Sequence, residues 1–223
     1  MEVKVLQDIM KANDSLAEEN ASLFKARRIF AVNMMSSPGS GKTTILERTL
    51  SLLAGTTKVA VIEGDVKTTL DAERLAKYQV PVVQIHTELF GSTCHLDANM
   101  VMRAFRSLPG DEPFRLLFVE NVGNLVCPAG FKLGTDRNVV VLSVTEGEDK
   151  PLKYPAMFRN SDLLLINKVD LLPHLEFSMD ALFAAVKEIN AAIKIITLSA
   201  KTGEGFDGWT AWLAEGMSAK SLP

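Results

Sequence analysis

The chain has 223 residues, of which 47% are hydrophobic and 23% charged, and its net charge at pH 7 is -3. This balance excludes a non-specific nucleic-acid binder, which would be basic, and no run of 18 apolar residues offers a membrane span. Two cysteines, Cys94 and Cys127, are too few for a disulfide framework and fit a reducing compartment. We therefore predict a cytoplasmic protein that binds neither nucleic acid nor membrane.

Residues 1–28 are predicted to form an amphipathic helical extension. Apolar residues recur at helical spacing from Leu6 to Phe24, between charged positions such as Lys11 and Glu18. Such a helix packs on its own domain, swings free or docks a partner, and the apolar stripe favours packing. Residues 29–223 show no repeat, linker or low-complexity segment, so we expect them to form a single domain.

Strand-like and helical patterns alternate through this domain. The predicted strands are Ile29–Met35, Lys58–Glu63, Val82–Ile85, Arg115–Asn121, Val139–Ser143, Leu163–Asn167 and Lys194–Ser199. The predicted helices are Thr43–Ala54, Asp71–Tyr78, His95–Leu108, Met179–Ala192 and Phe206–Glu215. Near-continuous apolar strands are typical of burial on both faces. The pattern therefore predicts an α/β fold with a mostly parallel sheet flanked by helices.

A phosphate-binding loop follows the first strand and opens the first strong helix. Residues 36–44 read Ser-Ser-Pro-Gly-Ser-Gly-Lys-Thr-Thr. In a P-loop the backbone N–H groups wrap the phosphates, the lysine reaches the β- and γ-phosphates, and the Thr hydroxyl binds Mg²⁺. Ser36 stands where the motif usually begins with glycine. The motif predicts a P-loop NTPase domain whose phosphate contacts are Pro38, Gly39, Ser40, Gly41, Lys42, Thr43 and Thr44.

A second motif indicates guanine rather than adenine. Residues 167–170 read Asn-Lys-Val-Asp, and the Asp170 carboxylate can accept hydrogen bonds from guanine N1–H and from its exocyclic amine. Adenine lacks this donor pair, so it would leave a buried acceptor unpaired. Asn167 and Lys168 complete the motif, and Ser199, Ala200 and Lys201 follow the last strand, where they can close over the base. Together these segments resemble the P-loop GTPase superfamily, which implies GTP as the nucleotide.

Two acids stand near strand ends, where open α/β sheets bind ligands. Asp65 follows the second predicted strand, and Glu120 begins Glu-Asn-Val-Gly, a variant of the Asp-x-x-Gly motif. In GTPases the glycine of that motif, here Gly123, senses the γ-phosphate. We predict that Asp65 and Glu120 join Thr43 around Mg²⁺, with Asp65 ranked first. Lys42 and Asp65 are the predicted catalytic residues.

Cys94, His95 and Cys127 are candidate ligands of a transition metal. Thiolate and imidazole suit zinc, nickel or copper, and a thiolate at a helix N-terminus ionises more readily. The spacing alone leaves the alternative open that the cysteines are simply buried and that His95 caps its helix.

Several segments resemble the hydrogenase nickel-incorporation GTPases, the HypB family. They are residues 36–44, 63–65 (Glu-Gly-Asp), 71–74 (Asp-Ala-Glu-Arg), 94–98 (Cys-His-Leu-Asp-Ala), 120–127 (Glu-Asn-Val-Gly-Asn-Leu-Val-Cys) and 153–155 (Lys-Tyr-Pro). The resemblance implies a GTPase that delivers nickel to [NiFe] hydrogenase. It also implies a homodimer favoured by nucleotide and metal, a small zinc-containing nickel chaperone (HypA-like) as partner, and the hydrogenase large subunit as client. The family's Ni²⁺ or Zn²⁺ site matches Cys94, His95 and Cys127.

Some members of that family carry a His-rich or Cys-x-x-Cys-Gly-Cys N-terminal segment, and residues 1–28 contain neither His nor Cys. We therefore expect metal binding only at the site in the GTPase domain. The chain is similar, less closely, to the urease accessory GTPase. Three alternatives stay open: a urease-directed nickel GTPase, an ATP-dependent P-loop kinase, and a non-enzymatic metal-binding module.

Overall fold

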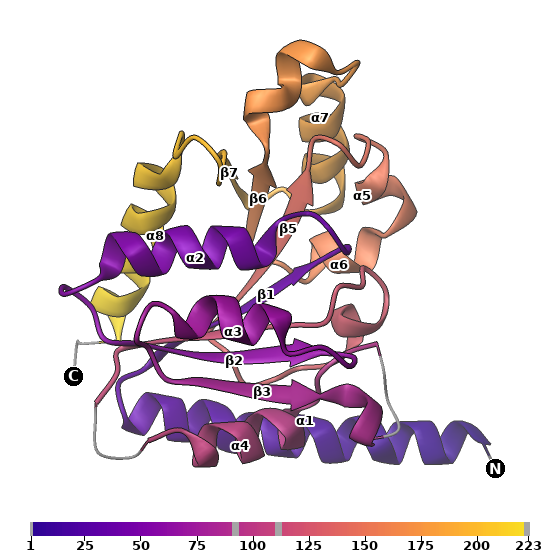
Figure 1. Cartoon of the computed structure of the whole chain (residues 1–223). Helices are drawn as coiled ribbons and strands as arrows, with labels where there is room; N and C mark the ends of the chain where they lie inside the picture. Colours follow the sequence, from indigo (N-terminus) through magenta and orange to yellow (C-terminus); the bar gives the residue numbers. More distant parts are fainter. Residues whose placement is uncertain (1, 91–93, 110–112, 221–223) are drawn as a thin grey trace.

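A seven-stranded, fully parallel sheet forms the centre of the computed structural model, which describes residues 2–90, 94–109 and 113–220 (Figure 1). The strand order is β3-β2-β4-β1-β5-β6-β7. The strands are β1 (Phe30–Ser36), β2 (Val59–Asp65), β3 (Val82–His86), β4 (Leu116–Glu120), β5 (Arg137–Ser143), β6 (Leu163–Asn167) and β7 (Lys194–Thr197). The predicted parallel α/β sheet is confirmed. Asp65 is the last residue of β2 rather than a residue beyond it.

The helices are α1 (Glu2–Ala26), α2 (Lys42–Leu53), α3 (Leu70–Ala76), α4 (Ala98–Ser107), α5 (Lys150–Lys153), α6 (Pro155–Arg159), α7 (Met179–Ile189) and α8 (Phe206–Ala219). Three short 3₁₀ segments are η1 (Thr87–Phe90), η2 (Cys127–Gly130) and η3 (Val169–His174). The pattern did not predict α5 and α6, because helices of 4 and 5 residues are too short to show a helical period.

Helix α4 begins three residues later than predicted. Asp97 is its N-cap, and the Asp97 carboxylate accepts a hydrogen bond of 2.7 Å from the backbone N–H of Met100. An N-cap aspartate fixes where a helix starts, because it satisfies a free N–H of the first turn. His95 therefore lies before the helix, and the expectations that it caps the helix or that Cys94 stands at the helix N-terminus are wrong.

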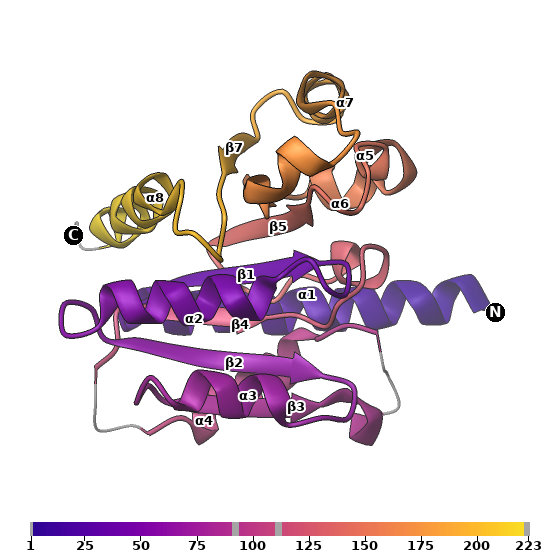
Figure 2. The ribbon, with the colours of Figure 1, turned by 45° about the horizontal axis from the view of Figure 1, so that its top comes forward.

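Helices cover both faces of the sheet (Figure 2). Helices α2, α3 and α8 share one apolar core with alternate residues of the strands, such as Val59 and Val61 of β2. The intervening residues Ala60 and Ile62 face the opposite side, where α1 and α4 pack, and α6 and α7 cover the remainder of that side. This alternation follows from the pleat of a strand, in which successive side chains point to opposite faces. It therefore also determines which face of the sheet each residue at the end of a strand lies on.

The N-terminal helix packs against α4 and the sheet. Phe24 is fully buried, and its ring meets that of Phe105 edge-on at 5.0 Å between centroids. The Asn20 side-chain amide donates to the carbonyls of Ala98 and Leu133, each at 2.9 Å. Residues 2–9 are helical, and their side chains lie outside the description. No described helix is long and apolar enough to cross a membrane.

Candidate functional site

The P-loop connects β1 to α2 and lines a cavity of about 520 Å³ at the carboxyl ends of the central strands. Gly39 and Gly41 have φ of +78° and +95°, a left-handed conformation that favours glycine. A Cβ at Gly41 would also lie 2.5 Å from the Asn167 amide nitrogen. Lys42 is buried, and its ammonium donates to the Ser36 hydroxyl at 2.8 Å. Ser36 therefore holds Lys42, a role that its position in the motif did not predict.

A buried acid lies on the side of the cavity where Mg²⁺ is predicted to bind. The Thr43 hydroxyl donates to Glu120 Oε1 at 2.7 Å, and Glu120 Oε2 has no hydrogen-bond partner in the described part of the chain. Burial raises the pKa of Glu120, and the nearby Lys42 ammonium opposes this rise. Asp65 lines the same cavity, but its Oδ1 accepts from the backbone N–H groups of Lys67 and Thr68 at 2.8 and 3.0 Å. Of the two acids, Glu120 therefore makes the contact with Thr43.

Gly123 lies against the P-loop. A Cβ added at Gly123 would be 3.1 Å from Pro38 Cα, so the backbones approach more closely than a larger residue allows. Gly123 also lines the phosphate cavity. The predicted γ-phosphate sensor is thus beside the loop that would hold the phosphates.

The predicted base-binding residues gather around an adjoining cavity of about 260 Å³ at the ends of β6 and β7. The Asn167 amide donates to Ser40 O at 2.9 Å and accepts from the N–H of Ala200 at 3.0 Å. The Lys168 ammonium donates to Gly39 O at 2.8 Å. These bonds tie the P-loop to both base-binding segments, so phosphate and base sites form one nucleotide site.

Asp170 is positioned by a neighbour. The Ser199 hydroxyl donates to Asp170 Oδ1 at 2.6 Å, and Asp170, Lys168, Ala200 and Lys201 all line the base cavity. The carboxylate keeps further lone pairs that can accept from a base. Its orientation is therefore set before the nucleotide binds.

Arg48 is a residue that the sequence reading missed. Its guanidinium, from α2, donates to the carbonyls of Ala200, Lys201 and Thr202 at 3.3, 3.4 and 3.2 Å, and it lies 5.4 Å from the centroid of the Phe206 ring. The partners are about 150 positions away in the chain, so no local pattern could reveal them. Arg48 links the helix that follows the P-loop to the loop that is predicted to close over the base.

We predict that Arg48→Met speeds dissociation of GDP. Losing partly exposed hydrogen bonds at this loop should cost about 1 kcal/mol of nucleotide binding, or roughly fivefold in the dissociation constant. Stopped-flow release of a fluorescent GDP measures it. Arg106→Met, on an exposed face of α4, is the matched control. Equal release rates for Arg48→Met and the control would contradict the role.

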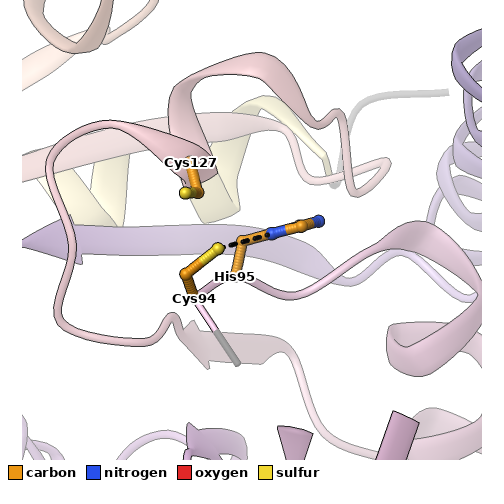
Figure 3. Close-up of side chains that lie close together, drawn as sticks. All are labelled: Cys94, His95 and Cys127. Carbon is orange, nitrogen blue, oxygen red and sulfur yellow. Dashed lines mark hydrogen bonds between the residues drawn. The ribbon is translucent and has the colours of Figure 1, made fainter. Parts of the chain in front are cut away.

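Cys94, His95 and Cys127 come together as predicted (Figure 3). One ligand atom of each lies within 4.8 Å of those of the other two, and Cys94 Sγ is 3.5 Å from His95 Nδ1. Cys94 and His95 precede α4, whereas Cys127 begins η2 after β4. Two sulfurs and an imidazole nitrogen are a donor set that zinc and nickel accept. The three residues therefore form a candidate transition-metal site.

Two neighbours orient these ligands. The Asn124 amide donates to Cys127 Sγ at 3.5 Å, and its oxygen accepts from the backbone N–H groups of Val126 and Cys127. The His95 ring stacks on Phe131 with centroids 3.9 Å apart. Burial lowers the pKa of His95, although Asp97 opposes this, and the neutral imidazole is the form that binds metals.

The candidate metal site is built onto the ends of β2 and β4. The N–H of Leu96, next to His95, donates to Asn121 Oδ1 at 3.1 Å. A Cβ on Gly64 would be 2.8 Å from the Leu96 side chain, so Leu96 fills the space that Gly64 leaves open between Glu63 and Asp65. The ends of β2 and β4, which face the predicted nucleotide site, are thus in direct contact with the segment that carries Cys94 and His95.

A parallel sheet with a P-loop after its central strand, together with the Asn167–Asp170 base site, defines a P-loop GTPase. Residues 30–197 match the family model described as CobW/HypB/UreG, nucleotide-binding domain. The chain is 52% identical over 218 residues to the hydrogenase maturation factor HypB of Azotobacter chroococcum mcd 1, covering 98% of this chain and 70% of the relative. The chain belongs to the CobW/HypB/UreG family, among its HypB GTPases.

Solved structures support the same assignment. The crystal structure of HypB from Helicobacter pylori in complex with nickel is 37% identical, with a TM-score of 0.88 over 95% of this chain and 98% of that one. The hydrogenase maturation factor HypB from Archaeoglobus fulgidus is 38% identical, with a TM-score of 0.85 over 93% of this chain and 99% of that one. The fold and the relative positions of its elements are therefore those of the HypB proteins.

Proposed function

We propose that this GTPase couples guanine-nucleotide binding and hydrolysis to the handling and delivery of nickel during [NiFe] hydrogenase maturation. The observation that carries the proposal is the contact between the two sites. Leu96 connects the segment of Cys94 and His95 to Gly64 and to Asn121. A rearrangement of these strand ends on GTP hydrolysis would therefore reach the metal ligands.

In this proposal Mg²⁺ is held by Thr43, Glu120 and Asp65, and it would neutralise charge on the β- and γ-phosphates when bound. The buried, unpartnered Glu120 Oε2 beside Thr43 fits such an ion. Lys42 binds the same phosphates, and the N–H of Gly123 senses the γ-phosphate. Loss of the γ-phosphate then releases the segment that leads from Gly123 to Cys127.

Nickel is the cargo of this proposal, and Cys94, His95 and Cys127 are its ligands, with Zn²⁺ as the competing ion. Three protein ligands leave one position of a four-coordinate site for water, a second copy of the chain or a partner. This supports a homodimer favoured by nucleotide and metal. A small zinc-containing nickel chaperone (HypA-like) is the proposed partner, and the hydrogenase large subunit is the proposed client.

The deciding experiment measures nickel affinity in two nucleotide states. We expect one nickel per chain, with an affinity that differs between GDP and a non-hydrolysable GTP analogue. Coupling free energies between sites are typically about 1–3 kcal/mol, or roughly 5- to 150-fold in affinity. Competition titrations with a chromophoric chelator give the affinities, and light scattering on the same samples gives the oligomer size. Identical affinities in both states would contradict the coupling and leave a static metal site.

The client is tested separately. Deletion of the gene should remove [NiFe] hydrogenase activity, and added nickel or the intact gene should restore it. Loss of urease activity with hydrogenase intact would instead identify a urease-directed nickel GTPase.

Asp170→Asn is predicted to change the preferred base. The carboxylate would no longer accept from the guanine N1–H and amine, whereas an amide can donate to the carbonyl of xanthine. Hydrogen bonds to charged groups are worth about 1.5–3 kcal/mol each, so GDP affinity should fall by roughly 100-fold or more. Competition of GDP, XDP and ADP for the site measures the change. An unaltered preference for GDP would show that Asp170 does not contact the base.

A further inference from the structure

Three asparagine side chains lie in a row across the middle of the sheet. Asn33 belongs to β1, Asn138 belongs to β5, and Asn121 directly follows β4, so the three come from neighbouring strands. The Asn121 amide donates to Asn33 Oδ1 at 3.2 Å, and the Asn33 amide donates to Asn138 Oδ1 at 3.0 Å. On the same face of β1, Ala31 belongs to the core under α1 and α4, and Met35 to the core under α6 and α7. The row therefore runs between two apolar cores.

One end of this row reaches the segment that carries Cys94 and His95. Asn121 Oδ1 accepts from the backbone N–H of Leu96 at 3.1 Å and from that of Val122 at 3.0 Å. Leu96 is fully buried, so this hydrogen bond is shielded from water. Because Leu96 directly follows His95, the position of the Asn121 amide determines where the backbone beside His95 lies.

The other end of the row reaches the segment that begins at Cys127. The Asn138 amide donates to the carbonyl of Asn160 at 3.0 Å, and the Asn160 side chain donates to the carbonyl of Ala129 at 2.9 Å. Ala129 lies in η2, whose first residue is Cys127. A run of hydrogen bonds thus joins the two segments that supply the candidate metal ligands, and these ligands face each other from separate parts of the chain (Figure 3).

The two central asparagines are deeply buried. Asn33 and Asn121 are 2% and 1% exposed, and a buried amide costs free energy unless it is hydrogen-bonded. Each of them accepts with its oxygen and donates with its nitrogen, and the bonds all run in one direction, from Leu96 toward Asn138. Aligned hydrogen bonds strengthen one another, and a satisfied buried network holds one arrangement. A leucine would fill similar space without partners, so these amides fix geometry rather than add apolar burial.

We propose that Asn33 is a positioning residue for nickel binding, which sets the spacing between the two segments that supply the ligands. The inference rests on the proposed function and deepens it, since it concerns the same nickel ion at Cys94, His95 and Cys127. Two sulfurs and an imidazole bind one ion only when their segments are held at the distances that the metal requires. Residues behind the ligands hold this geometry, and their loss typically weakens metal binding by about 10- to 100-fold. Asn33 acts on the ligands through its two amide partners.

Competition titrations of nickel with a chromophoric chelator, on the full chain in its GDP state, test the inference. Asn33→Leu removes both bonds of the central amide and should weaken nickel binding by about 10-fold, the lower end of the range for supporting residues. Asn160→Ala, at an exposed position, removes the last bond of the row and should also weaken binding several-fold. The double variant should bind nickel no more weakly than Asn33→Leu, because both substitutions interrupt the same row.

The control is Asn99→Ala, which is exposed on α4 and nearer to His95 in the chain than Asn160 is. It should bind nickel as the wild type does. The absorption bands of the nickel–thiolate bonds give a second readout, because they depend on how the sulfurs are arranged around the ion. The bands should shift in Asn33→Leu and stay in place in Asn99→Ala. Loss of stability alone would lower the amount of bound nickel without moving the bands.

Wild-type affinity and unshifted bands in both Asn33→Leu and Asn160→Ala would overturn the positioning role. A double variant whose loss of affinity equals the product of the two single losses would overturn it as well. Thermal unfolding followed by circular dichroism shows which variants are folded, and if Asn33→Leu is not, the comparison of Asn160→Ala with Asn99→Ala decides. Wild-type protein that binds no nickel would instead count against the proposed function, so the two failures are distinguishable.

Discussion

Lys42→Ala is expected to reduce GTP turnover by about 100- to 1,000-fold, the usual effect of removing one preorganised charge-stabilising group from an active site. The Lys42 ammonium is buried in the P-loop beside the Ser36 hydroxyl, and it is near enough to Glu120 to oppose the rise that burial causes in the pKa of that acid. Its charge therefore acts in a site with little water, where it is screened weakly. Single-turnover hydrolysis of GTP measures the effect.

The control for this prediction is Lys77→Ala, an exposed lysine after α3, which should turn over GTP at the wild-type rate. Circular dichroism of Lys42→Ala should show a folded protein, because Lys42 is not part of an apolar core. A folded Lys42→Ala variant that hydrolyses GTP normally would show that this loop is not the phosphate site.

The double substitution Cys94→Ala, Cys127→Ala is expected to remove stoichiometric nickel. Loss of a single supporting residue around a metal typically weakens binding by 10- to 100-fold, so removing two direct ligands should exceed about 100-fold. Metal analysis after dialysis against nickel, with the protein in its GDP state, measures the loss. GTP hydrolysis without nickel should persist, because neither cysteine lines the phosphate cavity.

His174→Ala is the control for the metal prediction, since His174 is exposed and lies at the end of η3. It should retain one nickel, whereas His95→Ala should not. One nickel per chain retained by the double cysteine variant would place the ion elsewhere in the protein.

Most of the fold was predictable because its determinants are local. Continuous apolar strands such as β4 and β6, and the glycine-rich turn between β1 and α2, are visible within a few residues. Strand β5 begins at Arg137 rather than Val139, because its first residues pair with β1 although they are polar. The start of α4 was predicted too early because the Asp97 carboxylate, and not the His95 side chain, caps the helix.

The sequence predicted the ligand residues of the sites better than their supports. Lys42 and Asp170 belong to local motifs with a chemical purpose at fixed spacing, whereas Cys94, His95 and Cys127 were predicted through the resemblance to the HypB family. Arg48, Asn124 and Phe131 support them through contacts that depend on tertiary structure. Phe131 in particular follows η2 and meets His95 from a segment 36 positions later in the chain, so no periodicity could indicate it.

The order of the strands places the predicted base-binding residues and the candidate metal ligands on opposite sides of the P-loop. β6 and β7, which lead into the predicted base-binding segments, lie beyond β5 (Figure 1). β2 and β4 lie on the other side of β1 (Figure 2). A substitution that changes which base is accepted should therefore leave Cys94, His95 and Cys127 in place. An Asp170→Asn variant in a cell would then respond to added XTP, which the cell's other GTPases do not use. Its nucleotide state could be set at a chosen moment while every other guanine-dependent process continued on GTP.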